Sequence, residues 1–264
     1  MAEKTLSTWS PLRLSLFRAL WLAAVASNVG TWMHNVGAEW LMTTLAPTPF
    51  VVALMQTAET APTFLLALPA GALADIVDRR RLLLFSQAWM LVAAVALAAS
   101  ALAGLTSPAV LLLLTFALGL GAAMNGPAWQ AIVPELVPRE ELAAAVSLNS
   151  VAFNIARAVG PALGGLLVAA AGAGWVFALN ALSFVVVALA IASWRRQAAA
   201  DPVGREPMVA ALRSGARYVR HAPAMRRVLV RVVLFVPAAS ALWALLPLVA
   251  TDLLAMGSSG YGVL

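Results

Sequence analysis

The chain has 264 residues, of which 62% are hydrophobic and only 11% are charged, and its mean hydropathy is +0.91. This composition lies far outside the range of soluble globular proteins and indicates an integral membrane protein. The net charge of +6 does not indicate a nucleic-acid-binding protein, because that class requires arginines clustered on one folded face, whereas these arginines fall between apolar segments.

Seven apolar segments are long enough to cross a bilayer as helices, which takes about 20 residues each. In chain order we predict spans at 20–44, 50–74, 82–103, 108–132, 142–171, 175–194 and 228–251. Helices are expected because lipid cannot satisfy open backbone groups, and these segments lack the alternating pattern of a membrane β-barrel. The first segment is too long for a secretory signal, so we interpret it as a retained span.

The connections between these spans alternate in charge. Those at 47–49, 104–108 and 172–174 contain no charged residue, whereas those at 75–81, 135–141 and 195–227 are charged. Since Lys and Arg are enriched in cytoplasmic connections, the pattern predicts that the N-terminus and the charged connections are cytoplasmic.

The same pattern predicts three parts of the chain. Residues 1–194 form a six-helix bundle, 195–227 a basic cytoplasmic linker, and 228–264 a seventh helix with the start of an incomplete second bundle. In the linker, Arg213, Arg217 and Arg220 share one helical face, which suits a helix on the anionic inner leaflet. A solvated linker helix with no lipid contact explains the same residues.

Three motifs together resemble one known family. They are Gly71-x3-Asp75-x3-Arg79-Arg80-Arg81, Pro134-Glu135-Leu136-Val137-Pro138-Arg139, and Arg157-x2-Gly160-Pro161-x2-Gly164-Gly165. From about residue 12 to its end the chain resembles the N-terminal half of a major facilitator superfamily transporter, in the bacterial subgroup that contains the enterobactin exporter. The resemblance implies an all-α protein of the bacterial plasma membrane, a six-helix bundle with a 3+3 inverted repeat, and a missing C-terminal half.

The connection between the second and third spans resembles the superfamily's cytoplasmic loop signature. Its residues are Gly71, Asp75, Asp78, Arg79, Arg80 and Arg81. Arginines at a helix start oppose the helix dipole, and Asp75 and Asp78 near the helix ends offset this effect. We predict a latch that holds the cytoplasmic side closed against the opposite half; anchoring of the arginines on the positive side of the membrane is the alternative.

The fifth span carries Gly160, Pro161, Gly164 and Gly165, which resemble an antiporter-type signature. Proline removes one backbone hydrogen bond, and closely spaced glycines let a neighbouring helix approach. We predict a helix that can pivot, with a packing kink as the alternative.

Ionisable groups inside spans are the strongest functional signal, because each costs about 2.5 to 3.5 kcal/mol at mid-membrane. Here they are Glu39, Glu59 and Arg157. Polar side chains accompany them on the first, second, fourth and fifth spans, which line the pathway in the resembling superfamily: Asn28, Asn35, Gln56, Asn125 and Asn154. We predict that Glu39 or Glu59 carries a coupling proton, and that Arg157 pairs with a carboxylate or attracts an anionic substrate group. A permanent ion pair between Arg157 and a glutamate is the alternative.

Other chemistries are not indicated. Lys4 is the only lysine, so the chain has no Gly-Lys-Ser phosphate loop, and it contains no Gly-x-Ser-x-Gly elbow. His34 and His221 lack metal-ligand spacing, there are no cysteines, and His34 is expected to be a packing residue. We therefore expect a protein that is not an enzyme, has no cofactor, metal or nucleic-acid partner, and is driven by an ion gradient.

Together these patterns predict a proton-coupled exporter of small amphipathic molecules that works by alternating access. Its expected partners are membrane lipids, protons and a small-molecule substrate. Two alternatives stay open: a lipid or lysophospholipid flippase, and a truncated, non-transporting half-protein that needs a second half.

Overall fold

The computed structural model describes residues 7–45, 48–194, 217, 220–254 and 256–262, and within these ranges every regular element is helical. A short 3-10 helix, η1 (Ser10–Arg13), precedes the first long helix. The elements that follow are α1 (Ser15–Leu45), α2 (Pro49–Ile76), α3 (Arg79–Leu102), α4 (Pro108–Leu136), η2 (Arg139–Glu141), α5 (Leu142–Ala171), α6 (Ala173–Ser193), α8 (Pro223–Leu248), the π-helical turn η3 (Val249–Leu253) and α9 (Ser258–Tyr261). All seven predicted spans correspond to long helices, within a few residues at each end.

Local sequence explains where these helices begin. Proline occupies the first position of α2, α4 and α8, where its missing N–H costs no hydrogen bond. The Asp78 carboxylate caps α3 by accepting a bond from the Arg81 N–H at 2.9 Å, and the Ser107 hydroxyl caps α4 in the same way. Between α5 and α6 the turn is made by Gly172, whose φ of 88° favours glycine.

The packing of α1 to α6 is that of a 3+3 repeat. The principal contacts are α1 with α5 and α6, α4 with α2 and α3, and α3 with α6. Exchanging α1–α3 for α4–α6 turns each of these contacts into another member of the same set. This pseudo-symmetry is typical of transporter bundles and confirms the predicted architecture.

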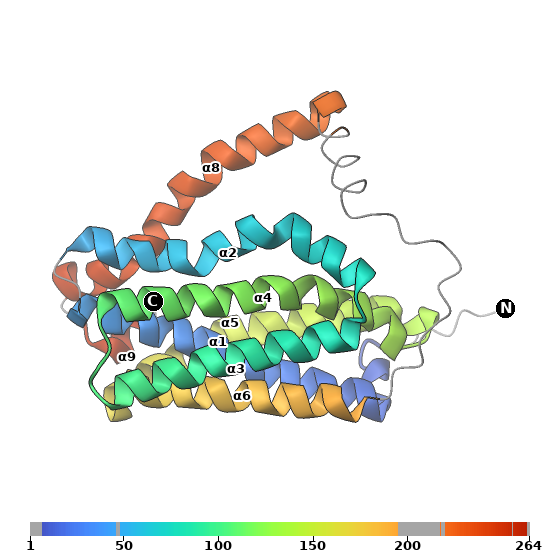
Figure 1. The fold of residues 1–264 in the computed structure, drawn as a ribbon, viewed down its shortest axis with the longest axis horizontal. Helices are drawn as coiled ribbons and strands as arrows, with labels where there is room; N and C mark the ends of the chain where they lie inside the picture. Colours follow the sequence, from blue (N-terminus) through green and yellow to red (C-terminus); the bar gives the residue numbers. More distant parts are fainter. Residues whose placement is uncertain (1–6, 46–47, 195–216, 218–219, 255, 263–264) are drawn as a thin grey trace.

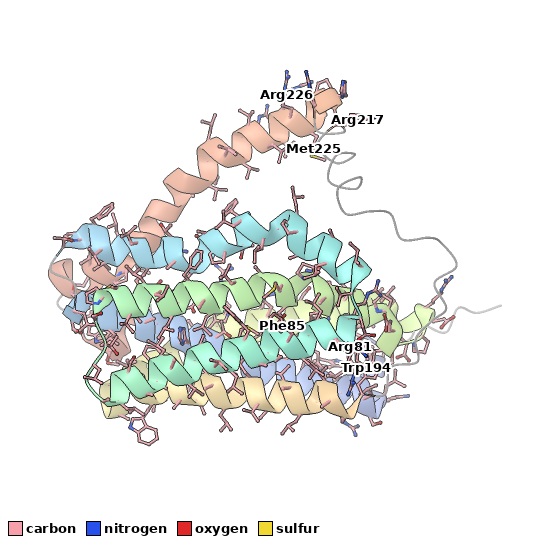
Figure 2. The ribbon with its side chains drawn as sticks, viewed as in Figure 1. Arg81, Phe85, Trp194, Arg217, Met225 and Arg226 are labelled. Carbon is pink, nitrogen blue, oxygen red and sulfur yellow. The ribbon has the colours of Figure 1, made fainter. Side chains whose placement is uncertain are left out.

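The bundle has two chemically different ends (Figure 1). The charged end carries η1, the α2–α3 and α4–α5 connections and the last turn of α6. The uncharged end carries the C-terminal ends of α1, α3 and α5, together with α9. Arg81 and Trp194 both lie at the charged end in Figure 2. The arginines of the described connections between α1 and α6 therefore lie on one side of the bundle.

Five helical segments are long and apolar enough to cross a membrane by length and composition: those at 49–74, 79–102, 108–136, 139–171 and 173–193. α1 is not among them although it has 31 residues, because its polar side chains lower its mean hydropathy. It is nevertheless packed between α5 and α6. A helix of this length extends about 46 Å, which exceeds the hydrocarbon thickness.

α8 diverges from the bundle and meets it only near its C-terminal end (Figure 1). That end packs on α2 and α1, while Val233, Leu234 and Phe235 are exposed. Arg226 and Met225 lie at the distant end of the helix (Figure 2). Most of the predicted linker, including Arg213, lies outside the described residues, so its membrane-surface helix stays a prediction.

Candidate functional site

A cavity of about 770 Å³ lies within the charged-end half of the bundle. α1 contributes residues 24–28, α4 residues 125–134 and α5 residues 142–154, and α3 and α6 each add one side chain. Its polar lining consists of amides and hydroxyls: Ser27, Asn28, Gln87, Asn125, Gln130, Asn149, Ser150 and Asn154. Trp129 and Phe153 supply aromatic surface. Among the described residues no charged side chain lines this amide-lined cavity.

One wall of the amide-lined cavity is fixed by a buried pair of amides. The Gln87 Nε2 of α3 donates to the Asn125 Oδ1 of α4 at 3.1 Å. Gln87 is only 3% exposed, and its Oε1 has no hydrogen-bond partner among the described residues. A buried unpaired acceptor is costly, so this oxygen favours a ligand that offers a hydrogen-bond donor.

A second polar group, the carboxylate pair Glu39 and Glu59, lies in the uncharged-end half. Glu39 is in the last third of α1 and Glu59 is in the first half of α2. The two carboxyl groups lie within electrostatic range of each other, and the Glu59 Oε1 is buried without a hydrogen-bond partner among the described residues. Eleven residues separate Asn28 from Glu39, so the amide-lined cavity and the carboxylate pair are about 16 Å apart along α1.

Glu39 also contacts the end of the described chain. The Tyr261 hydroxyl donates a hydrogen bond to the Glu39 Oε2. The Tyr261 ring stacks on Trp40, with ring centroids 6.1 Å apart and an interplanar angle of 26°. Sequence reasoning missed this contact, which joins residues 222 positions apart.

The glycines of α5 form two close contacts on different sides of the helix. A Cβ on Gly160 would lie 2.5 Å from the Trp32 Cβ, and one on Gly164 would lie 2.8 Å from the Met33 Cα, so α1 approaches there. A Cβ on Gly165 would lie 2.4 Å from the Ser258 carbonyl oxygen, where the segment containing α9 approaches. These glycines therefore lie at close contacts, and Pro161 lies inside the helix between Gly160 and Gly164; whether the helix pivots stays a prediction.

Arg79 and Arg80, which follow the α2–α3 connection, form hydrogen bonds and an ion pair with other helices of the same bundle. The Arg79 Nη1 forms an ion pair with the Glu135 Oε1 at 2.8 Å and also donates to the Ala131 carbonyl oxygen at 3.1 Å, both on α4. Arg80 donates from Nη2 to the Ala192 carbonyl oxygen at 2.8 Å, which caps the C-terminal end of α6. The arginines therefore link α3 to α4 and α6.

The other predicted residues are placed as follows. Asn28, Asn125 and Asn154 line the amide-lined cavity, whereas Asn35 and Gln56 are half-buried on α1 and α2, outside its lining. Arg157 is exposed on α5. Asp75 lies in the last turn of α2 with its side chain outside the described set, and a Cβ on Gly71 would meet no atom within 4 Å.

His34 is a packing residue, as expected. It is 3% exposed, and its ring centroid lies 4.8 Å from that of Phe177. Within the described residues there is no group of three or more His, Cys, Asp or Glu side chains that could hold a metal ion.

Comparison with known proteins places these features in a family. Residues 6–264 match the family model described as a transmembrane secretion effector. The chain is 30% identical over 225 residues to the multidrug efflux pump Tap of Mycolicibacterium fortuitum, covering 82% of this chain and 54% of that protein. It is 27% identical over 163 residues to the staphyloferrin A transporter of Staphylococcus aureus, covering 61% and 41%.

A third relative is the enterobactin exporter EntS of Salmonella typhimurium, which is 27% identical over 198 residues, covering 74% of this chain and 47% of that protein. Among solved structures, a bacterial homologue of the human lysosomal transporter Spinster, in an inward-facing and unoccupied conformation, superposes with a TM-score of 0.71. At 16% identity this likeness concerns the fold alone; it covers 96% of this chain and 58% of that one. The chain spans about half the length of the curated relatives it matches.

Proposed function

This chain belongs to the transmembrane secretion effector family of the major facilitator superfamily, and on that premise we propose that it acts in a proton-coupled exporter of small amphipathic molecules. In this proposal the exporter works by alternating access between two six-helix halves, of which residues 1–194 supply one. It resides in a bacterial inner membrane, with the N-terminus and the charged end in the cytoplasm.

The observation that carries the proposal is the amide-lined cavity. A volume of about 770 Å³ suits a drug-sized molecule, and its lining mixes aromatic surface with neutral hydrogen-bonding groups. Such a lining binds a molecule that has both apolar and polar faces. Its position at the charged end would admit substrate from the cytoplasm, which is the side from which an exporter loads.

Glu39 and Glu59 are the proposed proton carriers. Each lies on a helix next to other polar side chains, and the two carboxyl groups lie within electrostatic range of each other. Two neighbouring carboxylates in an apolar bundle resist carrying two charges, which favours exchange of one proton. The arginines of the α2–α3 connection and Asp75 would close the cytoplasmic side against the second half.

Transport in proteoliposomes tests the proposal. We expect the full-length protein to move a fluorescent amphipathic dye when a proton gradient is imposed, and to stop when the gradient is collapsed by an ionophore. The double variant Glu39→Gln with Glu59→Gln should lose gradient-driven transport but retain dye binding. Glu140→Gln, at an exposed position of the α4–α5 connection, is the matched control and should transport normally.

Two outcomes would contradict the proposal. Gradient-driven transport that survives in the double variant would remove Glu39 and Glu59 from coupling. A full-length protein that folds but moves neither dyes nor siderophores would favour a lipid substrate or a membrane protein that does not transport.

A further inference from the structure

Residues 257–262 are packed into the uncharged end of the bundle. One glycine of this segment and one of α5 leave no room for a side chain, because a Cβ on Gly262 would lie 2.3 Å from the Pro161 carbonyl oxygen and one on Gly165 would lie 2.4 Å from that of Ser258. Ser258 and Tyr261 are each 6% exposed. The segment is therefore seated against α5 by backbone-to-backbone contact.

The same segment reaches α1 through one side chain. Tyr261 packs with Val36 and Ala250, stacks on Trp40, and donates a hydrogen bond from its hydroxyl to the Glu39 carboxylate. Among the described residues, Tyr261 provides the hydrogen bond to Glu39, and the ionisable groups within electrostatic range of Glu39 are Tyr261 and Glu59. On α5 the closest atoms to the segment belong to the uncharged Pro161 and Gly165, and the charged residue of that helix, Arg157, lies four residues before Pro161.

We infer that residues 257–262 close the uncharged end over the carboxylate pair, and that Tyr261 is the positioning residue that ties this closure to the charge of Glu39. The inference rests on the proposed function and deepens it, because it names the group that senses the proton. A phenol donates a stronger hydrogen bond to a charged carboxylate than to a neutral carboxylic acid. Charged Glu39 holds the segment in place, and protonated Glu39 holds it less tightly.

The consequence is an ordered exchange. Protonation of Glu39 weakens the Tyr261 bond, residues 257–262 leave α5, and the carboxylate pair becomes accessible from the uncharged side. When Glu39 loses its proton, the hydrogen bond to Tyr261 strengthens again and the segment returns. Tyr261 does not itself gain or lose a proton in this sequence.

Tyr261→Phe tests the positioning role, because it removes the hydroxyl and keeps the ring that stacks on Trp40. Charged Glu39 loses its donor, so it accepts a proton at a higher pH; the pH of half-maximal transport should rise by about one unit. Ser258→Ala removes a buried hydroxyl from the same segment without touching Glu39 and should leave the pH profile unchanged. A pH profile that is the same in Tyr261→Phe and in the parent protein would overturn the inference.

Cysteine labelling tests the closure without any transport measurement. The chain contains no cysteine, so Val36→Cys introduces a single thiol beneath Tyr261 in an otherwise unchanged protein. In that background Gly262→Ala should raise the labelling rate from the uncharged side by about tenfold, because the added methyl group clashes with α5. Gly257→Ala places its methyl group in open space of the same segment and should have no effect.

The two readouts separate the inference from the proposed function. If the full-length protein transports nothing, the proposed function fails, while labelling of Val36→Cys still reports on the closure. If transport is proton-driven but labelling is equal in Gly262→Ala and Gly257→Ala, the closure is wrong and the exporter proposal stands.

Discussion

The amide-lined cavity and the carboxylate pair are opposites in chemistry and in position. The cavity lies at the charged end and has a neutral lining, whereas Glu39 and Glu59 lie in the half of the bundle whose connections carry no charge. About 16 Å of α1 separates them. The charged connections thus mark one end of the protein, while the buried carboxylates lie toward the other.

Under the proposed function, this separation means that substrate and proton would not compete for one set of side chains. A neutral cavity avoids the cost of desolvating a charge each time a substrate binds or leaves. The desolvated charge lies instead at the carboxylate pair, where Tyr261 supplies a hydrogen bond to Glu39. The two regions share α1, and α5 packs along the same helix through Gly160 and Gly164. Coupling between them therefore has a direct structural route.

The largest effect is expected from breaking that route. Gly164→Val forces a branched side chain against the Met33 backbone, because even a Cβ on residue 164 would lie 2.8 Å from the Met33 Cα. Backbone cannot move aside as a flexible side chain does, so we expect loss of transport and destabilisation by about 3 kcal/mol. Thermal unfolding in detergent measures the destabilisation. Ala158→Val, at an exposed position of the same helix, should unfold within a degree or two of the parent protein.

Next in size is a change confined to the carboxylate pair. Glu59→Gln removes a buried group that has an unpartnered oxygen and lies within electrostatic range of Glu39. We expect gradient-driven transport to fall about tenfold or more, while dye affinity changes less than twofold, since the cavity is untouched. Equilibrium dye binding gives the affinity, and proton-driven uptake by the same preparation gives the transport rate. A parallel loss of affinity would mean that the two regions are not separate.

The converse change is Gln87→Leu, which breaks the amide pair in the wall of the cavity. It leaves the Asn125 Oδ1 without its donor and removes the free Gln87 acceptor. We expect the KM for substrate to rise about tenfold, with the pH profile unchanged. Gln130→Leu removes an exposed amide of the lining that is not part of this pair, and it should raise KM less. A shifted pH profile in Gln87→Leu would contradict the division of labour.

The smallest effect is expected outside both regions. Arg80→Ala removes the hydrogen bonds that cap the last carbonyl groups of α6, and should lower the free energy of unfolding by about 1 kcal/mol. Substrate KM and the pH profile should stay as in the parent protein. Thermal unfolding together with one transport assay is sufficient to check this. A transport defect without loss of stability would instead support the latch role predicted for this connection.

The helices were predictable from sequence because their causes are local. Length of apolar segment, proline at first positions and the capping carboxylate of Asp78 each act within a few residues. The bundle's internal repeat followed from family resemblance. The close spacing of the glycines in α5 is also a local signal, so a close helix contact could be predicted there. Which helix these glycines face could not be predicted.

The rest depended on contacts between distant parts of the chain. Gln87 is a single amide in an apolar span and gave no periodic signal; its importance comes from Asn125, 38 residues away. Tyr261 is in a short terminal helix, and only folding brings it to Glu39. Arg79 was predicted as a latch, but its ion pair with Glu135 of α4 could not be inferred from the loop motif alone. The roles of Asp75 and Arg157 stay predictions.

The divergence of α8 has a mechanical consequence. The helix has 26 residues and so forms a rod of about 39 Å, which joins the bundle through the π-helical turn Val249–Leu253 and then the segment that carries Tyr261. π-helical turns are among the places where helices change direction sharply. We therefore expect a change in the direction of α8 to reach the segment that carries Tyr261 through this one turn.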